Sequence, residues 1–278
     1  MTQNGLTVIG FFCWWTIQGV KIAKEELYNL LHAAGIPLEV RKTVERSRFL
    51  KALEAVKQNY KAKGLLIRKI YKNQVEYKFG LVDESVDKAA GNLSYSHSAT
   101  LTFFPNSGDI QCDRPHRAEE LIREEYQRAM ENYDSDDVRD IIFEVLSDLH
   151  TLSVRNRGGI YFIPAVHADV VAKLEAFVAS LPGGSSYFSA APQIDTERTK
   201  GSIYQSFLQG LKDKIAAYKT DIDSGKGATR GHAIQNRLDE FVELKKEINF
   251  YADALSFQAK DLEEQLDNLT QEVRSKLL

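Results

Sequence analysis

Glu76 and Lys78 come closer than any other residues to the spacing of a catalytic pair. They stand two apart in residues 74–82, a segment with the composition of a strand, so both side chains would lie on one face of a sheet. Metal-dependent nucleases use an acidic residue and a lysine in this arrangement, together with an upstream acidic metal ligand. No such ligand can be identified, and a solvated surface pair is the commoner use of the pattern.

The other reactive side chains are too sparse for a metal or a nucleophile site. Cys112 and His116 are close in sequence, but zinc takes four ligands and no second close pair accompanies them. Cys13 and His150 would form a nucleophile and its base only if the fold happened to join them. Residues 225–229 lack the spacing of a phosphate-binding loop. We therefore expect no catalytic residue, metal or cofactor, unless an active site is assembled from residues distant in sequence.

The elements of residues 1–114 indicate an antiparallel sheet with two helices. Polar and apolar residues alternate most regularly in 93–104, which is typical of a strand with one solvated face. A 3–4 spacing of apolar residues marks the helices. The expected strands are 6–15, 64–72, 74–82, 93–104 and 110–112, and the expected helices are 21–31 and 44–61.

The middle segment, residues 115–195, has the outline of a winged-helix unit. A helix at 136–150 precedes two short apolar strands, and the hairpin between them carries Arg155, Asn156 and Arg157 at its tip. In such units the helix enters the major groove and the wing contacts phosphates. This helix has five acidic residues and one arginine, so a duplex would repel it. Nucleic acid could still be contacted by the tip, which could equally pair with an acidic protein surface.

Residues 196–278 are expected to form a long antiparallel helical hairpin of the coiled-coil kind. Apolar residues step by four and three through 204–222, and residues 224–229 form a flexible turn. In the second arm they recur seven apart at Phe241, Ile248, Leu255, Leu262 and Leu269.

The two arms of this expected hairpin are unequal in length. The first has about 26 residues and the second about 48, or roughly 70 Å of helix at 1.5 Å per residue. Burying an aliphatic side chain contributes about 1.5–3 kcal/mol, so the overrun should be covered by the protein's own body, a second copy or another protein. The expected partner interface is Leu255, Leu262, Leu266, Leu269 and Val273.

The overall composition is that of an ordinary globular protein. The formal charge is −3 and the pI about 6.1, so there is no global electrostatic case for nucleic acid or an anionic membrane, although a local basic patch remains open. Two distant cysteines and no secretion signal favour a reducing, cytoplasmic setting. The apolar stretch 6–15 is too short to span a bilayer and reads as a buried strand, so no membrane contact is expected.

Three segments, taken in order, resemble an uncharacterised domain family of phage, bacterial and archaeal proteins. They are 14–22 (WWTIQGVKI), 158–164 (GGIYFIP) and 236–241 (NRLDEF). The resemblance implies no activity, cofactor or catalytic residue, but it favours a virus or mobile-element setting.

The sequence therefore predicts an α+β protein in three parts: an antiparallel α+β domain (1–114), a winged-helix-like segment (115–195) and a helical hairpin (196–278). The expected function is non-enzymatic interaction or assembly, with the C-terminal helix binding a protein partner or a second copy. The alternative is nucleic-acid binding through Arg155, Asn156 and Arg157, which the charge of the neighbouring helix disfavours.

Overall fold

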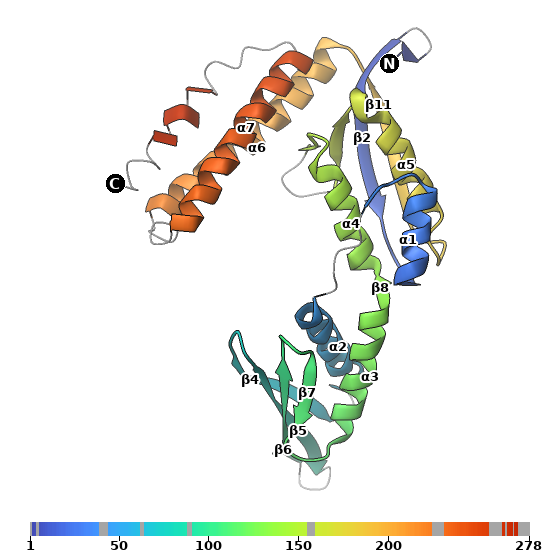
Figure 1. The fold of residues 1–278 in the computed structure, drawn as a ribbon, viewed down its shortest axis with the longest axis vertical. Helices are drawn as coiled ribbons and strands as arrows, with labels where there is room; N and C mark the ends of the chain where they lie inside the picture. Colours follow the sequence, from blue (N-terminus) through green and yellow to red (C-terminus); the bar gives the residue numbers. More distant parts are fainter. Residues whose placement is uncertain are drawn as a thin grey trace. The chain divides into compact units, whose positions relative to one another are not determined.

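The computed structural model describes most of the chain and is built from two compact units. The described residues are 2–3, 6–38, 44–61, 64–87, 91–154, 159–223, 231–255, 263–264, 266–268 and 270–271. Unit 1 comprises Met1–Gly19, Ala33–Ile36 and Asp137–Leu278, and unit 2 comprises Val20–His32 and Pro37–Asp136. The protein is thus α+β with antiparallel sheets, as expected (Figure 1).

The larger part of unit 2 is a four-stranded antiparallel sheet with two helices on one face (Figure 1). Its strands follow chain order: β4 (Leu65–Lys72), β5 (Tyr77–Asp87), β6 (Asn92–Phe104) and β7 (Asp109–Cys112). The helices are α2 (Glu45–Tyr60) and α3 (Arg117–Glu131). Alternate strand residues, among them Tyr77, Leu81 and Phe103, meet Phe49 of α2 and Ile122 of α3 in one core. The opposite face of the sheet carries the polar half of the alternation.

A second, smaller sheet completes unit 2. It pairs β3 (Lys21–Ala23) with β8 (Asn132–Asp134), and α1 (Lys24–Ala33) follows β3 directly. The helix expected at 21–31 therefore begins three residues later than predicted. Tyr133, at the centre of β8, is 7% exposed and faces the guanidinium of Arg48 on α2. This contact joins the small sheet to the larger helical layer within unit 2.

Unit 1 is organised around β2 (Leu6–Thr16), the strand expected at 6–15. It pairs with β10 (Tyr161–Pro164) on one side and β11 (Tyr187–Ile194) on the other, and β9 (Leu152–Ser153) extends the sheet beyond β10. Short β1 (Thr2–Gln3) also pairs with β2. The strands approach closely at Gly10, where an added Cβ would lie 2.4 Å from the Phe162 ring.

Helices cover both faces of the unit 1 sheet. Phe143 of α4 (Ser135–Ser147) contacts Trp15 and Tyr161, with ring centroids 5.4 and 5.8 Å away. Helix α5 (Ala168–Ala179) follows a short 3-10 turn, η2 (Ala165–His167), and packs against β10 and β11. On the other face Phe162 enters a core made by α6 (Glu197–Asp223) and α7 (Gly231–Leu255).

The pairing of β2 with β10 and β11 gives the chain a different organisation from the three consecutive parts expected. Residues 1–19 belong with 137–278, and neither 114 nor 195 is an edge of a unit. Since β10 is an inner strand of the β2 sheet, the middle segment is not an independent winged-helix unit. The physical reason is that backbone pairing over about 150 residues of separation leaves no local pattern in the sequence.

The expectation of one continuous second arm after residue 230 is also corrected. The described part of helix α7 covers Gly231–Leu255. Further on, Asp267 accepts both bonds of Lys245 Nζ at 3.0 Å. In a continuous helix these two residues would be roughly 33 Å apart at 1.5 Å per residue. Lys245 and Asp267 therefore do not belong to one continuous straight helix.

Within the described residues, no helix is both long and apolar enough to cross a membrane.

Candidate functional site

The residues that suggested chemistry in the sequence are held in structural contacts. Lys78 Nζ lies 2.9 Å from Glu76 Oε1, so these two side chains form the surface ion pair that was the commoner expectation. Burial, followed by the charge of Glu175, raises the pKa of the Cys13 thiol to about 12. That thiol is protonated at neutral pH, which is the opposite of what a nucleophile requires.

His116 serves as the N-terminal cap of α3. Its Nδ1 accepts a hydrogen bond from the backbone N–H of Ala118 at 3.1 Å, and its Nε2 lies 3.3 Å from Asp83 Oδ2. Ser98 Oγ donates to the same carboxylate oxygen at 2.6 Å. Because Nδ1 accepts, Nε2 carries the proton, and His116 is used in capping. Among the described residues, no group of three or more Cys, His, Asp or Glu side chains is arranged to hold a metal ion.

The predicted partner interface is divided by the structure. Leu255 and Leu266 are 6% and 1% exposed and belong to the core of α6 and α7 within unit 1. For these two leucines the protein's own body supplies the cover. Leu262, Leu269 and Val273 lie outside the described residues, and so do Arg155, Asn156 and Arg157.

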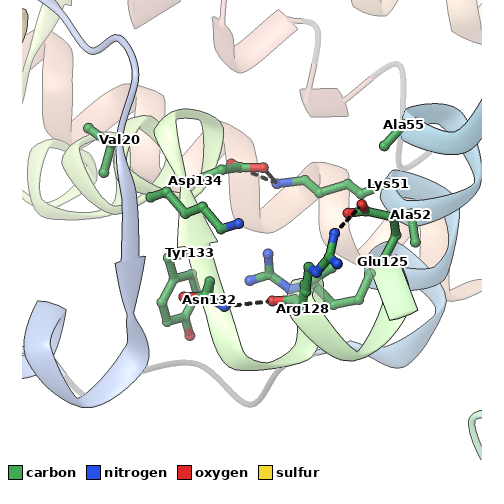
Figure 2. Close-up of a pocket in the computed structure, with 12 residues that line it drawn as sticks. Val20, Lys51, Ala52, Ala55, Glu125, Arg128, Asn132, Tyr133 and Asp134 are labelled. Atoms are coloured by element: carbon green, nitrogen blue, oxygen red, sulfur yellow. Dashed lines mark hydrogen bonds and ion pairs between the residues drawn. The ribbon is translucent and has the colours of Figure 1, made fainter. Parts of the chain in front are cut away.

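A cavity of about 210 Å³ in unit 2 gathers charged side chains from separate elements (Figure 2). Arg48 and Lys51 come from α2, Glu125 and Arg128 from α3, and Lys21 and Asp134 from the small sheet. The rest of the lining is apolar or neutral: Val20, Ala52, Ala55, Ala129, Asn132 and Tyr133. Four cations thus share the cavity with two carboxylates.

The polar side chains of the cavity are organised by contacts along its wall. Lys51 Nζ donates to both oxygens of Asp134 at 2.9 Å, and Arg128 lies 2.6 Å from Glu125 Oε1 (Figure 2). Arg48 is 5% exposed, and its guanidinium stands 4.9 Å from the centroid of the Tyr133 ring. Asn132 Nδ2 donates to the backbone oxygen of Arg128 at 2.9 Å.

A second cationic feature runs along α2 and the neighbouring edge strand β4. Over the described residues 44–61 and 64–78 there are nine Lys and Arg and only three Asp and Glu. Five exposed cations of this stretch make no ion pair with any described residue, and we call them the basic surface: Arg46, Lys61, Arg68, Lys69 and Lys72.

Two members of the basic surface are placed by an aromatic ring. Arg46 and Lys72 stand over Tyr77, at 5.5 and 4.8 Å from its centroid. Tyr77 is itself 1% exposed, so the ring is fixed in the core and the two cations are held close together. Tyr71, also on β4, is 46% exposed.

Helix α3 has the opposite charge. It carries five glutamates against three arginines, and Arg123 and Arg128 are paired with glutamates of the same helix. Opposite charges are therefore carried by α2 and α3, and they largely cancel in the total charge of unit 2. A charge count over a window of about 35 residues would have found the basic surface in the sequence, whereas the formal charge of the whole chain could not.

Comparisons with known proteins identify a family but no characterised relative. No curated protein and no solved structure matches the chain. A family model described as a family of unknown function (DUF6744) matches residues 8–278, which includes both units. The chain therefore belongs to this family of unknown function.

Proposed function

We propose that the chain is a non-enzymatic, cytoplasmic nucleic-acid-binding protein that contacts its ligand through the basic surface of unit 2. The observation that carries the proposal is the set of five exposed cations with no ion pair among the described residues. Charges that are already paired gain little from a phosphate, because the existing partner must be given up. A cation without such a partner gives up no ion pair when it binds a phosphate. Binding then releases counterions from the nucleic acid, and this release is the main source of affinity.

The dimensions of the surface suit a polyanion. Helix α2 has 16 residues and is thus roughly 24 Å long at 1.5 Å per residue. Duplex DNA presents about 14 phosphate charges over that length, at one per 1.7 Å of axis. The acidic helix α3 would repel the same ligand, so the charge separation within unit 2 also favours one orientation of binding.

An exposed aromatic residue lies within the basic surface. Tyr71 is on β4 between Lys69 and Lys72, and its hydroxyl accepts a hydrogen bond from Asn73 Nδ2 at 2.7 Å. Bases of a single strand stack on aromatic rings with little sequence preference. This arrangement supports binding to single strands as well as to duplexes.

Fluorescence anisotropy with labelled single-stranded and duplex oligonucleotides tests the proposal. If five cations each neutralise one phosphate, log affinity falls with log salt with a slope of about −3.5 on single strands. The double variant Lys69→Glu/Lys72→Glu should weaken binding at least tenfold and reduce the magnitude of that slope by about 1.4.

The matched control is Lys212→Glu/Lys246→Glu, which changes the net charge equally at exposed positions of unit 1. It should leave affinity nearly unchanged. Equal losses in the two double variants, or no binding of either oligonucleotide at low salt, would overturn the proposal.

Arg155, Asn156 and Arg157 stay in this proposal as a second contact. Their support is the sequence alone: two arginines at the tip of a short hairpin. Arg155→Ala/Arg157→Ala should weaken binding less than the variant in the basic surface, because two phosphate contacts are removed without charge reversal. Unchanged affinity would remove the tip from the proposal and leave unit 2 as the site.

Assembly through the C-terminal region is the second candidate function. Its support is the seven-residue spacing that continues through Leu262 and Leu269 to Val273 in the coiled-coil pattern. Size-exclusion chromatography with light scattering should show a lower mass, or loss of a co-purifying protein, for Leu262→Asp/Leu269→Asp. An unchanged mass and an unchanged set of bound proteins in a folded variant would contradict assembly by this region.

A further inference from the structure

We propose that the outer face of the four-stranded sheet in unit 2 is a platform on which the bases of a single-stranded nucleic acid stack, with Tyr95 and His97 of β6 as its rings. The outer face is the side of β4–β7 that turns away from α2 and α3 (Figure 1). The inference deepens the proposed function and rests on it in the choice of nucleic acid as the ligand. It adds residues of β6, which the basic surface does not include.

The strand register assigns both rings to the outer face. Tyr95 pairs with Glu84 on β5, and residues that pair across a ladder lie on the same face of the sheet. His97 pairs with Val82. Val82 and Glu84 stand one and three positions after the core residue Leu81, which places them on the opposite side from the core. Tyr95 is 59% exposed and His97 is also exposed, so both rings are open to a ligand.

Two bulges and a glycine shape the middle of the outer face. Ile70 is the extra residue of a bulge in β4, and Ser98, next to His97, is the extra residue of a bulge in β6. Bulges change the direction in which side chains point. At Gly80, between the two bulges, an added Cβ would lie 3.4 Å from Ile70 Cδ1 and 3.3 Å from His97 Nδ1. The absence of a side chain at this glycine therefore lets an exposed surface cross from Ile70 on β4 to His97 on β6.

Two aromatic rings of the outer face are fixed at their polar edges. His97 Nε2 lies 3.2 Å from Thr100 Oγ1, and the hydroxyl of Tyr71 accepts the bond from Asn73 Nδ2 at 2.7 Å. Within the described part of the chain, neither ring stacks on another aromatic side chain, and nor does the ring of Tyr95. A base stacks on the face of a ring, so binding leaves these edge hydrogen bonds in place.

The spacing of the two β6 rings favours single strands over duplexes. Tyr95 and His97 are two residues apart on one strand, which is roughly 6.8 Å at 3.4 Å per residue. Successive bases in one strand of a duplex are about 3.4 Å apart along the axis, and their faces are covered by their neighbours. Bases must therefore be unpaired and unstacked to reach both rings.

The charges beside the platform fit the backbone of the same strand. Arg68 of the basic surface pairs with Gly80 and so lies at the β4 edge of the outer face, and Lys69 and Lys72 follow it along β4. Strands β4 and β6 are two positions apart in the sheet, roughly 9.6 Å at 4.8 Å per strand. Phosphates on β4 would thus leave the bases over β6. Glu84, opposite Tyr95, repels phosphate and favours a base at that end.

Fluorescence anisotropy of the full chain with two labelled strands of equal length tests the inference. One strand is an oligothymidylate, and the other has the same sugar–phosphate backbone with abasic sites in place of the bases. We expect the wild type to bind the oligothymidylate about tenfold or more tightly than the abasic strand, because each stacked base contributes a factor of about five or more.

Tyr95→Leu keeps an apolar side chain and removes the ring, so it should weaken binding of the oligothymidylate about fivefold or more. Affinity for the abasic strand and the salt dependence should stay unchanged, because no charge is lost. Tyr95→Phe should retain the wild-type affinity, and His97→Leu should repeat the selective loss at a second position. The matched control is Tyr187→Leu, which removes a strand tyrosine of unit 1 that is 49% exposed and should change neither affinity.

Equal affinity of the wild type for the two strands would overturn the platform and leave the basic surface as the site. Unchanged oligothymidylate binding in Tyr95→Leu and His97→Leu would overturn it too, and would assign the exposed rings to a protein partner. Equal losses on both strands would also contradict it, because stacking cannot act on a strand without bases. If neither strand binds at low salt, the proposed nucleic-acid function itself fails.

Discussion

The basic surface of unit 2 and the α6–α7 core of unit 1 handle their charged and apolar side chains in opposite ways. In unit 2, five cations are exposed without an ion pair among the described residues, and helix α3 carries five glutamates against three arginines. In unit 1, Phe207 and Leu211 of α6 and Phe241 and Ile248 of α7 are buried in one core with Phe162.

The difference between the two units shows which sequence pattern, apolar spacing or unbalanced charge, better indicates a binding surface. A regular apolar spacing tells where a helix buries its face, and here the described part of that face is covered by the same chain. An unbalanced set of charges has no such internal cover. The surface of unit 2 is therefore the stronger indication of a ligand, although the apolar seam is more conspicuous in the sequence.

Truncation of Leu266 should have the largest effect on stability. This side chain is 1% exposed in the unit 1 core, so Leu266→Ala should reduce the free energy of unfolding by about 2–5 kcal/mol. Val242→Ala on α7 is the control, since Val242 is 56% exposed and should change stability little. Chemical denaturation measures both, and equal small effects would mean that Leu266 is not buried within the chain.

Loss of the α3 cap should have an intermediate effect, confined to unit 2. His116→Ala removes the acceptor for Ala118 N–H and the bond to Asp83, at a cost of about 1–2 kcal/mol. His97→Ala on the exposed part of β6 is the matched control, with an expected change within about 0.5 kcal/mol. Hydrogen exchange should localise the loss to α3, and a uniform loss over both units would contradict the assignment.

Removal of the Lys245–Asp267 pair should have a small effect. Both side chains are largely exposed, at 42% and 57%, so Lys245→Ala should reduce stability by less than about 1 kcal/mol. The pair is more useful as a marker that residues 245 and 267 are adjacent than as a source of stability. Spin labels at positions 245 and 267 should lie close together, and a separation of roughly 33 Å would indicate the continuous helix.

Acid should affect the two units in different pH ranges. In unit 1, burial and then the charge of His150 lower the pKa of His167 below its usual 6.5, and His167 Nε2 is buried with no hydrogen-bond partner among the described residues. In unit 2, the Ser98 and then the His116 hydrogen bonds lower the pKa of Asp83 below 3.8.

Both pKa values are lower in the folded state, so both contributions to stability are present at higher pH and are lost as pH falls. His167 begins to lose its contribution below 6.5, whereas Asp83 does so only below 3.8. Denaturation followed by hydrogen exchange should therefore show unit 1 weakening first. His167→Gln should flatten that loss between about pH 7 and pH 5, and an unchanged slope would contradict it.

The sequence predicted most of the local elements and little of their long-range pairing. The expected strand at 93–104 and the helix at 44–61 agree with β6 and α2 within one residue at each end, because their apolar periods are long and regular. By contrast, β3 and β8 have three residues each, too few for a period to be visible. The union of β2 with β10 and β11 likewise depends on contacts that no local pattern records.

The candidate sites could not be found in the sequence for two reasons. The cavity residues are far apart in the sequence, and the charge of the basic surface is lost in the formal charge of the whole chain. Lys21, Lys51 and Arg128 come from three segments that only the fold brings to one cavity. The basic surface is local, but its charge is cancelled in the total by the glutamates of α3 and by other acidic residues. The expected continuous second arm was wrong for another reason: a seven-residue spacing gives no sign that Asp267 lies beside Lys245.

Hydrogen exchange of the full chain with and without a saturating oligonucleotide tests the central claim most directly. The account predicts slower exchange in α2 and β4, with no protection of α3. Protection confined to unit 1, or an unchanged pattern throughout the chain, would contradict it.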